Sequence, residues 1–305
     1  MRKTKPAKSV PAKLPITVSH PDKVFWPEEG YTKLDLVEYY DAIFPKLSPY
    51  VKDRILALER CPDGMQGECF FQKQKPKSMP PGTPTKRIAH ESGTAKFTDY
   101  VVGGSLITQL ALANLGCIAV HVMAGRASSP RQSDWLCIDI DPETGKFADA
   151  ARAGLRVKAA LDALKLVSYA KTSGSRGMHV LVPLRTGAEA DEVLAFAESF
   201  VARVAAAHPD ELTVEHSIKA RGDRVYLDPF RNGFGQTVVA PYSVRRREKA
   251  PVSTPLEWPE VKPTLIPSSF NMGNFAKRIK RADPWSDFFE NRQSLKDAAR
   301  LLNKL

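Results

Sequence analysis

Two aspartates stand two residues apart in the apolar stretch Leu136-Cys137-Ile138-Asp139-Ile140-Asp141-Pro142. Side chains alternate between the two faces of a β-strand, so Asp139 and Asp141 are expected to share one face while the apolar residues cover the other. Two such carboxylates repel each other by roughly 1 kcal/mol or more once partly desolvated, unless a cation lies between them. Mg²⁺ and Mn²⁺ prefer carboxylate oxygens and keep positions open for phosphates. The stretch therefore predicts a metal site for phosphate chemistry, or else a solvated strand end before a turn.

The charge of the chain favours a polyanionic partner. Its 305 residues carry 45 Lys and Arg against 34 Asp and Glu, a formal net charge of +11, and the pI is about 9.4. Cations that neutralise phosphates give salt-sensitive, sequence-independent affinity, so nucleic acid is the first candidate. With 43% hydrophobic residues the chain can bury a core, as one large or two ordinary domains.

Cysteine spacing and hydropathy indicate the compartment. The four cysteines, Cys61, Cys69, Cys117 and Cys137, show no Cys-x-x-Cys pair and no zinc spacing, so we expect reduced, mostly buried thiols. No apolar run approaches the ~18 residues of a membrane span. The basic N-terminus also lacks the apolar segment of a signal peptide. These features predict a cytoplasmic protein without membrane association.

Several cations precede the aspartates. Residues 1–13 are basic and free of acids, which predicts a flexible arm, with a solubilising tail as the alternative. Thr32 followed by Asp35 predicts a capping box at a helix start. Lys33 then lies in the first turn, where its charge interacts unfavourably with the helix dipole. A bound anion shared by Lys33, Lys23 and the free N–H groups of the helix start would make this position favourable. Two solvated lysines are the alternative.

Adjacent aromatic residues suggest a stacking surface. Phe70 and Phe71, followed by Lys73, suit base stacking beside backbone phosphates. Burial of both rings in a core is the alternative. Hydrophobic periodicity further predicts helices over residues 105–115, 147–165 and 189–207 and at the C-terminus through 302, and strands over 118–123, 167–171, 178–182, 225–228 and 237–240.

The loop Thr172-Ser173-Gly174-Ser175-Arg176-Gly177 leaves backbone N–H groups free beside a cation, which is typical of a phosphate-binding turn. It lacks the Walker spacing, and a generic hairpin turn is the alternative. Farther on, Asp228 ends a strand and faces away from the core. Arg245 and Arg247 share a side of an extended segment and could clamp a triphosphate.

This set of residues resembles the polymerase domain of the bacterial ATP-dependent DNA ligase D family, within the archaeo-eukaryotic primase superfamily. The resemblance covers about residues 16–257. It rests on Trp26-Pro27-Glu28, Phe70-Phe71-Gln72-Lys73, Asp139-Ile140-Asp141-Pro142, Thr172-Ser173-Gly174-Ser175-Arg176-Gly177-Met178-His179, Leu227-Asp228-Pro229-Phe230-Arg231-Asn232 and Ala240-Pro241-Tyr242-Ser243-Val244-Arg245. The order and spacing of these segments are specific together, whereas each alone is not.

The resemblance implies an α+β fold in which an RRM-like catalytic sheet with flanking helices packs against an N-terminal α/β module. We therefore expect a primase-polymerase domain over 14–260, with an N-terminal module of about 14–115 and a catalytic module of about 116–250. A basic, partly helical extension over 261–305 follows. The implied activity is template-dependent nucleotidyl transfer, with ribonucleotides preferred, at DNA gaps or double-strand break ends. The implied chemistry is a two-metal displacement using Mn²⁺ or Mg²⁺.

The resemblance also assigns roles to individual residues. The metal-binding catalytic acids match Asp139, Asp141 and Asp228. The nucleotide-binding positions match His121, Ser173, Gly174, Arg176, His179, Lys219 or Arg221, Arg231, Arg245 and Arg247. The DNA-binding positions match Lys23 and Lys33 for a 5′-phosphate, Phe70 and Phe71 for template stacking, and Lys73. Two departures are Arg176 and Met178, where members usually carry Lys and Leu, and an extra residue around 219–223 that leaves the choice between Lys219 and Arg221 open.

The implied partners are DNA with a 5′-phosphate at a gap or break, NTP or dNTP, a bacterial Ku protein and a separate DNA ligase. The protein is expected to be a monomer associated with the bacterial nucleoid. No ligase or nuclease domain is expected in the chain, which is either a free-standing polymerase or a piece of a longer protein. Two alternatives remain: a metal-dependent nuclease, which would not need the triphosphate-binding residues, and a non-catalytic DNA-end-binding module, which would not need the acids.

Overall fold

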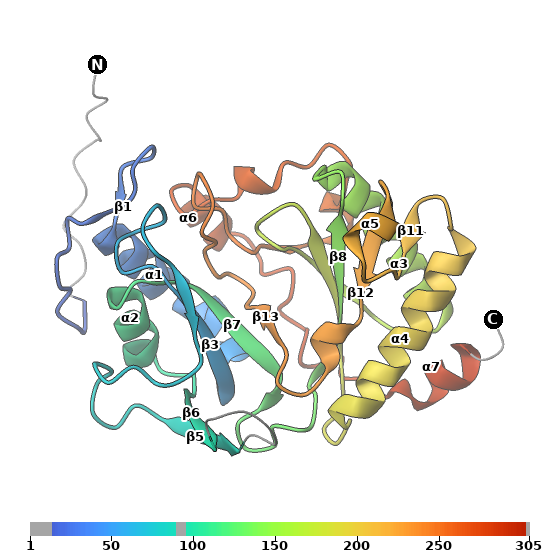
Figure 1. The fold of residues 1–305 in the computed structure, drawn as a ribbon, viewed down its shortest axis with the longest axis horizontal. Coiled ribbons are helices and arrows are strands. Elements are labelled where there is room, and N and C mark those ends of the chain that lie inside the picture. The colour runs from blue at the N-terminus through green and yellow to red at the C-terminus, as the bar shows by residue number, and fades with distance from the viewer. Residues whose placement is uncertain (1–13, 90–95, 303–305) are drawn as a thin grey trace.

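Two main sheets, with helices on their outer sides, build a mixed α+β molecule (Figure 1). The structure is a computed structural model that describes residues 14–89 and 96–302. The basic arm expected over 1–13 lies outside the described residues. No helix in the described ranges is long and apolar enough to cross a bilayer.

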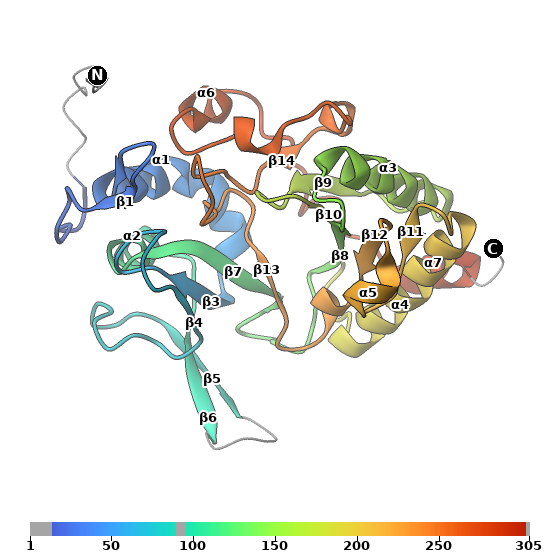
Figure 2. The ribbon, with the colours of Figure 1, turned by 45° about the horizontal axis from the view of Figure 1, so that its top comes forward.

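The first sheet has four antiparallel strands in the order β13-β7-β3-β4. These are β3 (Arg54–Arg60), β4 (Phe70–Gln72), β7 (Cys117–Arg126) and β13 (Thr237–Val239). Helices α1 (Lys33–Val51) and α2 (Leu106–Asn114) share a hydrophobic core with this sheet. Two pairs of antiparallel strands flank this sheet. The pair before α1 consists of β1 (Val24–Trp26) and β2 (Tyr31–Thr32). The other pair, β5 (Thr85–Ala89) and β6 (Phe97–Val101), projects from the body of the molecule (Figure 2).

The second sheet has six strands in the order β11-β12-β8-β10-β9-β14. These are β8 (Trp135–Pro142), β9 (Tyr169–Thr172), β10 (Met178–Pro183), β11 (Leu212–Thr213), β12 (Val225–Asp228) and β14 (Pro255–Leu256). Helices α3 (Phe147–Ala163), α4 (Ala190–Ala207) and α7 (Leu295–Leu302) pack on one face. The short elements are α5 (Ile218–Arg221), α6 (Phe275–Ile279) and the 3-10 turns η1 (Phe230–Asn232), η2 (Trp258–Glu260) and η3 (Pro267–Ser269).

Strand alternation in β8 decides where the polar face of this sheet lies. Leu136, Ile138 and Ile140 are buried in the core with α3 and α4. Asp139 and Asp141 therefore point to the opposite face, toward the first sheet, as their spacing predicts.

The predicted capping box opens α1. The Thr32 side chain accepts a hydrogen bond from the backbone N–H of Asp35, at 3.2 Å. The Asp35 carboxylate in turn accepts from the backbone N–H of Thr32, at 2.8 Å. This reciprocal pair satisfies two N–H groups that a helix start leaves open, and it fixes Lys33 at the first helical position.

The first sheet takes strands from both sides of the module boundary expected near residue 116. The strand that begins at Cys117, β7, pairs with β3 of the first sheet, and β13 returns from residue 237 to pair with β7. From the segment after 260, Phe275, Trp285 and Phe288 are buried in the core of the first sheet. The first sheet and its core are thus completed by segments from the later part of the chain.

The prediction of four reduced thiols is wrong for one pair. Cys61 and Cys69 form a disulfide, while Cys117 and Cys137 are free and buried. The physical reason is strand register. Arg60 of β3 lies opposite Phe70 of β4 in an antiparallel pair, so Cys61, which follows Arg60, faces Cys69, which precedes Phe70. Spacing alone does not reveal such a pairing.

Removing this disulfide is expected to destabilise the first sheet. Loop-closure entropy for cysteines separated by eight residues amounts to about 2.5 kcal/mol. The Cys61→Ser/Cys69→Ser variant should therefore melt several degrees below the oxidised wild type in a thermal-unfolding measurement. Reductant should lower the melting temperature of the wild type to that of the variant and leave the variant unchanged. Equal melting of the oxidised wild type and the variant would contradict a stabilising role.

Candidate active site

Three acidic or basic side chains meet on the polar face of the second sheet because their strands are neighbours. Asp139 of β8 lies opposite His179 of β10 on one side. On the other side it lies opposite Asp228 of β12. Since residues in register across neighbouring strands project to the same face, the strand positions alone bring the first and third predicted acids together.

Arg231 joins the two acids. It lies in the turn η1, directly after β12, and the turn is fixed because the Phe230 N–H donates to Asp228 Oδ1 at 2.8 Å. Arg231 Nε is 3.3 Å from Asp139 Oδ2 and 3.2 Å from Asp228 Oδ2. His179 Nε2 lies 3.2 Å from Asp139 Oδ1.

The acids differ strongly in their electrostatics. Burial acts to raise the pKa of Asp139, but His179, Arg231 and Lys171 outweigh it and hold that pKa well below its usual range. Burial, with the added repulsion of Asp139 and Asp228, raises the pKa of Asp141 to about 7. Burial also raises the pKa of Asp228. The site therefore crowds negative charge at Asp141.

The three carboxylates are the groups of this site with ligand chemistry for a hard divalent cation. Oxygen donors suit Mg²⁺ and Mn²⁺, and a cation would counter the burial and the repulsion by Asp139 and Asp228 that raise the pKa of Asp141. In the described ranges, no group of three His, Cys, Asp or Glu side chains is already arranged to hold a metal ion. Arg231 bridges Asp139 and Asp228. For a metal ion to bind both carboxylates, Arg231 would have to turn away from one of them.

A cavity of about 440 Å³ separates these acids from the first sheet. From the second sheet it is lined by Asp139, Asp141, Ser173, Ser175, Arg176, Gly177, His179 and Arg231. From the other side it is lined by Phe71, His121, Thr237, Val238, Val239, Arg245 and Arg247. One cavity thus gathers most residues that the sequence predicts for metal and nucleotide binding.

The serine- and glycine-rich loop connects β9 and β10, which are antiparallel neighbours, so it is a hairpin turn that also borders the cavity. Ser173 Oγ donates to Gly177 O at 2.9 Å and accepts from Ser175 N at 3.2 Å. Gly174 has φ +72°. A Cβ at Gly177 would lie 2.2 Å from Ile140 O, so only glycine lets the loop approach β8.

His121 projects into the cavity from β7 as a neutral ring. Burial and the nearby Arg245 and Lys171 lower its pKa to about 3. Its Nε2 is buried and has no hydrogen-bond partner within the described part of the chain. The ring meets Phe71 edge to face, at 5.3 Å between centroids and 78° between planes. A buried nitrogen without a partner is costly, so His121 is available to a bound ligand.

The two phenylalanines form no core. Phe70 is 42% exposed and Phe71 is 63% exposed, because β4 is a three-residue strand at the edge of its sheet. Only Phe71 reaches the cavity, while Phe70 lies near the Arg60 guanidinium, 5.5 Å from the ring centroid. Lys73 is exposed and does not line the cavity.

Lys219 and Arg221 can be told apart by their surroundings. Both belong to α5, outside the lining of the cavity. Arg221 pairs with Glu143 and covers the Tyr226 ring, 3.8 Å from its centroid. Its charge acts on Asp141, whereas Lys219 is exposed. The structure therefore places Arg221 nearer to the acids.

Lys23 and Lys33 lie together at the start of α1, in the first half of the molecule. The Lys33 N–H donates to Lys23 O at 2.8 Å. Lys33 is buried, its Nζ donates to Ser19 Oγ at 3.2 Å, and burial together with Lys23 lowers its pKa. Lys23 pairs with Asp63. The two cations are adjacent, as an anion shared between them requires.

The sequence analysis missed Lys171. This residue is fully buried in β9, opposite His179, and its Nζ donates to Ser253 Oγ at 2.6 Å. Burial lowers its pKa to about 7, and its charge acts on His121, His179 and Asp139. The signal was present in the alternation of β9, which puts Lys171 on the polar face of the sheet.

Comparisons with known proteins agree on one family. The family described as LigD, primase-polymerase domain, matches residues 32–285. The bifunctional non-homologous end joining protein LigD of Bacillus subtilis is 31% identical, over 89% of this chain and 44% of its own length. The multifunctional LigD of Pseudomonas aeruginosa is 29% identical, over 98% of this chain and 36% of its own length. The chain thus spans less than half the length of these relatives.

A solved structure agrees with the fold. The polymerase domain of Mycobacterium tuberculosis ligase D, in complex with DNA, superposes with a TM-score of 0.84 and 28% sequence identity, over 91% of this chain and 99% of the other. The family match covers both sheets and the candidate active site. The chain therefore belongs to the LigD primase-polymerase domain family.

Proposed function

We propose that the protein is a template-dependent nucleotidyltransferase that fills gaps and extends break ends in DNA during non-homologous end joining. The observation that carries the proposal is the shared cavity: Asp139 and Asp141 line it together with the Ser173–Gly177 loop, His121 and several arginines. Asp228 lies next to them, in register with Asp139. The related proteins support it, since two of them are named for non-homologous end joining and one is a polymerase domain in complex with DNA. The six-stranded sheet is then the RRM-like catalytic sheet.

Asp139, Asp141 and Asp228 would hold the divalent ions, Mn²⁺ or Mg²⁺, that activate the primer 3′-hydroxyl and neutralise charge on the α-phosphate and pyrophosphate. His179 and Arg231 orient Asp139 through their contacts of 3.2 Å and 3.3 Å. Arg231 can exchange its carboxylate contact for a phosphate, because its side chain is 39% exposed.

The remaining lining residues bind the nucleotide. The backbone of the Ser173–Gly177 loop and the guanidinium of Arg176 face the triphosphate, together with Arg245 and Arg247. His121 offers its free Nε2 to the sugar or a phosphate. Arg221, rather than Lys219, assists from α5. A preference for ribonucleotides and a Ku protein and a DNA ligase as partners are part of the proposal.

One incubation separates this function from its two alternatives. Labelled, gapped DNA is mixed with the protein, Mn²⁺ and ribonucleotides, and the products are resolved by size. A polymerase lengthens the primer, a metal-dependent nuclease shortens it, and a DNA-end-binding module only retards it on a native gel. The polymerase is favoured because the arginines and the loop beside the acids have no purpose in a nuclease. Lengthening only with added Mn²⁺ or Mg²⁺ is the expected result.

Phe71→Ala should weaken binding of gapped DNA by about 1–3 kcal/mol, since each stacked base contributes that much. The fold should survive, because the Phe71 side chain is exposed. Phe70→Ala is the matched variant, and a smaller loss is expected because Phe70 does not reach the cavity. Binding is measured by fluorescence anisotropy and folding by thermal melting. A large drop in melting temperature with unchanged affinity would argue against a stacking role for Phe71.

Acid should inhibit extension by protonating Asp141, whose pKa is about 7. A carboxylate binds metal only when ionised, so at low Mn²⁺ the rate should fall from pH 8 to pH 6, by up to about tenfold per pH unit below the pKa. Raising Mn²⁺ should shift this profile to lower pH. The pKa of Lys171 is also about 7, but Lys171 binds no metal, so a shift with Mn²⁺ indicates the metal-binding acids rather than Lys171. A profile independent of Mn²⁺ would contradict the assignment.

A further inference from the structure

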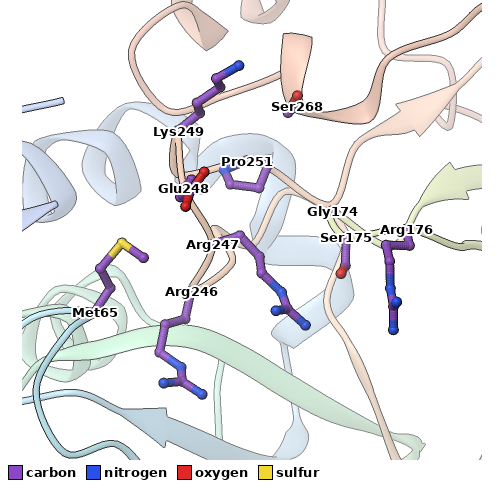
Figure 3. A pocket seen from close by; sticks show the side chains of 10 residues that line it. All are labelled: Met65, Gly174, Ser175, Arg176, Arg246, Arg247, Glu248, Lys249, Pro251 and Ser268. Atoms are coloured by element: carbon purple, nitrogen blue, oxygen red, sulfur yellow. The ribbon is translucent and has the colours of Figure 1, made fainter. Parts of the chain in front are cut away.

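A second cavity, of about 710 Å³, opens beside the catalytic cavity, and it is lined in part by residues that we have not assigned to the nucleotide, among them Arg246 and Lys249. Its walls come from four segments: the loop Gly174-Ser175-Arg176, the turn from Arg246 to Pro251, Met65 in the connection between β3 and β4, and Ser268 in η3 (Figure 3). Ser175, Arg176 and Arg247 line both cavities, so the two spaces adjoin. This volume lies in the range of ~300–1,000 Å³ that holds organic ligands rather than single ions.

The lining of this second cavity is strongly cationic. Its charged residues are Arg176, Arg246, Arg247, Glu248 and Lys249. Arg246 is partly neutralised, because its Nε lies 2.9 Å from Glu59 Oε1. Within the described chain, the side chains of Arg176, Arg247 and Lys249 have no ion pair. Figure 3 shows the three arginines directed to the same side of the turn. An excess of exposed cations in one hollow favours a ligand with several negative charges.

The turn that carries these cations is held rigidly. Lys249 and Ala250 have φ of 66° and 47°, a left-handed conformation that costs energy for residues other than glycine. Such a conformation persists only where the surroundings enforce it, and it concentrates at functional sites. Here Trp26 Nε1 donates to Arg247 O at 3.0 Å, and the Lys249 N–H donates to Glu29 Oε1 at 2.6 Å. The cations are therefore preorganised, which lowers the cost of binding.

The same contacts place this cavity between the catalytic cavity and the paired lysines. Trp26 and Glu29 belong to the hairpin region that runs from Lys23 to Lys33. The opposite wall is attached to that region too, because the Met65 N–H donates to Phe25 O at 2.9 Å. Cationic surface thus continues from the acids, through the second cavity, toward the site proposed for the 5′-phosphate.

We propose that the second cavity binds backbone phosphates of the unpaired DNA strand that spans a gap, between the inserted nucleotide and the downstream 5′-phosphate. The inference rests on the proposed polymerase function. Arg246 and Lys249 are the residues specific to this strand, because Arg176 and Arg247 also face the nucleotide.

The test removes two charges from this cavity and compares the effect with an equal change elsewhere. Arg246→Gln/Lys249→Gln keeps a hydrogen-bonding partner for Glu59, and Lys296→Gln/Arg300→Gln removes two cations from exposed positions on α7. Binding of labelled DNA is measured without nucleotide, over a series of salt concentrations. On a gap of several nucleotides, the first variant should bind at least about tenfold more weakly. The plot of log affinity against log salt concentration has a negative slope, and this slope should become less steep by about 0.7 for each lost phosphate contact.

Two controls identify the ligand. On nicked DNA, which has no unpaired strand, the first variant should lose much less affinity, and the α7 variant should match wild type on both DNAs. Equal binding by both variants on the gap would overturn the inference, as would a raised KM for the nucleotide with unchanged DNA binding. Failure of the polymerase proposal is read separately, from whether wild type extends the same gapped DNA.

Discussion

Asp139→Ala and Asp141→Ala should each reduce primer extension by at least about a thousandfold while leaving DNA affinity within about threefold of wild type. Bound metal stabilises the transition state by several kcal/mol, and 4 kcal/mol corresponds to about a thousandfold in rate. Both acids lie in the catalytic cavity, whereas the paired lysines lie in the other half of the molecule. Extension is measured under single-turnover conditions, and affinity by anisotropy on the same DNA.

Asp228→Ala should behave in the same way, because Asp228 lies in register with Asp139. Glu198→Ala is the matched control: it also removes one negative charge, from an exposed position on α4. This control should extend DNA at the wild-type rate. An Asp139 or Asp141 variant that lost binding and catalysis in equal measure would indicate that these acids support the fold rather than the reaction.

The second large effect concerns the end of the downstream strand. A 5′-phosphate should raise the affinity for gapped DNA tenfold or more, since each charge-assisted contact contributes roughly 1.5–3 kcal/mol. Lys33 is buried with a lowered pKa at the start of α1, and a phosphate shared with Lys23 would favour its charged form and satisfy the helix dipole. The increase in affinity is limited because Lys23 must give up its ion pair with Asp63 to bind the phosphate.

The measurement compares DNAs that differ only in a 5′-phosphate or a 5′-hydroxyl, at fixed salt. Lys23→Ala/Lys33→Ala should bind both DNAs equally. Lys277→Ala/Lys296→Ala, which removes two exposed lysines from α6 and α7, should keep the wild-type preference. If wild type ignores the phosphate, or the first variant still prefers it, the two lysines do not form this site.

Local patterns in the sequence predicted local features well. Alternation in one strand predicted the shared face of Asp139 and Asp141, and the spacing of Thr32 and Asp35 predicted the start of α1. In each case the geometry depends on neighbours within a few residues, which the sequence displays directly.

Features that depend on long-range pairing were not predictable in this way. The disulfide of Cys61 and Cys69 follows from the register of β3 with β4. The place of β7 in the first sheet follows from its pairing with β3. Trp285 is buried although it lies in a basic, proline-containing tail, because the core it enters is formed by residues more than 200 positions earlier, such as Tyr50. Which distant segments pair cannot be derived from a single amino-acid sequence.

The central claim is that Asp139, Asp141 and Asp228 hold the metal ions for nucleotidyl transfer. Its most direct test is a crystal structure of the protein soaked with Mn²⁺ and a non-hydrolysable nucleotide, with anomalous scattering used to locate manganese. We expect manganese bound by carboxylate oxygens of these three residues, the triphosphate beside Ser173 and Arg176, and Arg231 turned away from at least one acid. Manganese bound elsewhere, with Arg231 still bridging Asp139 and Asp228, would contradict the account.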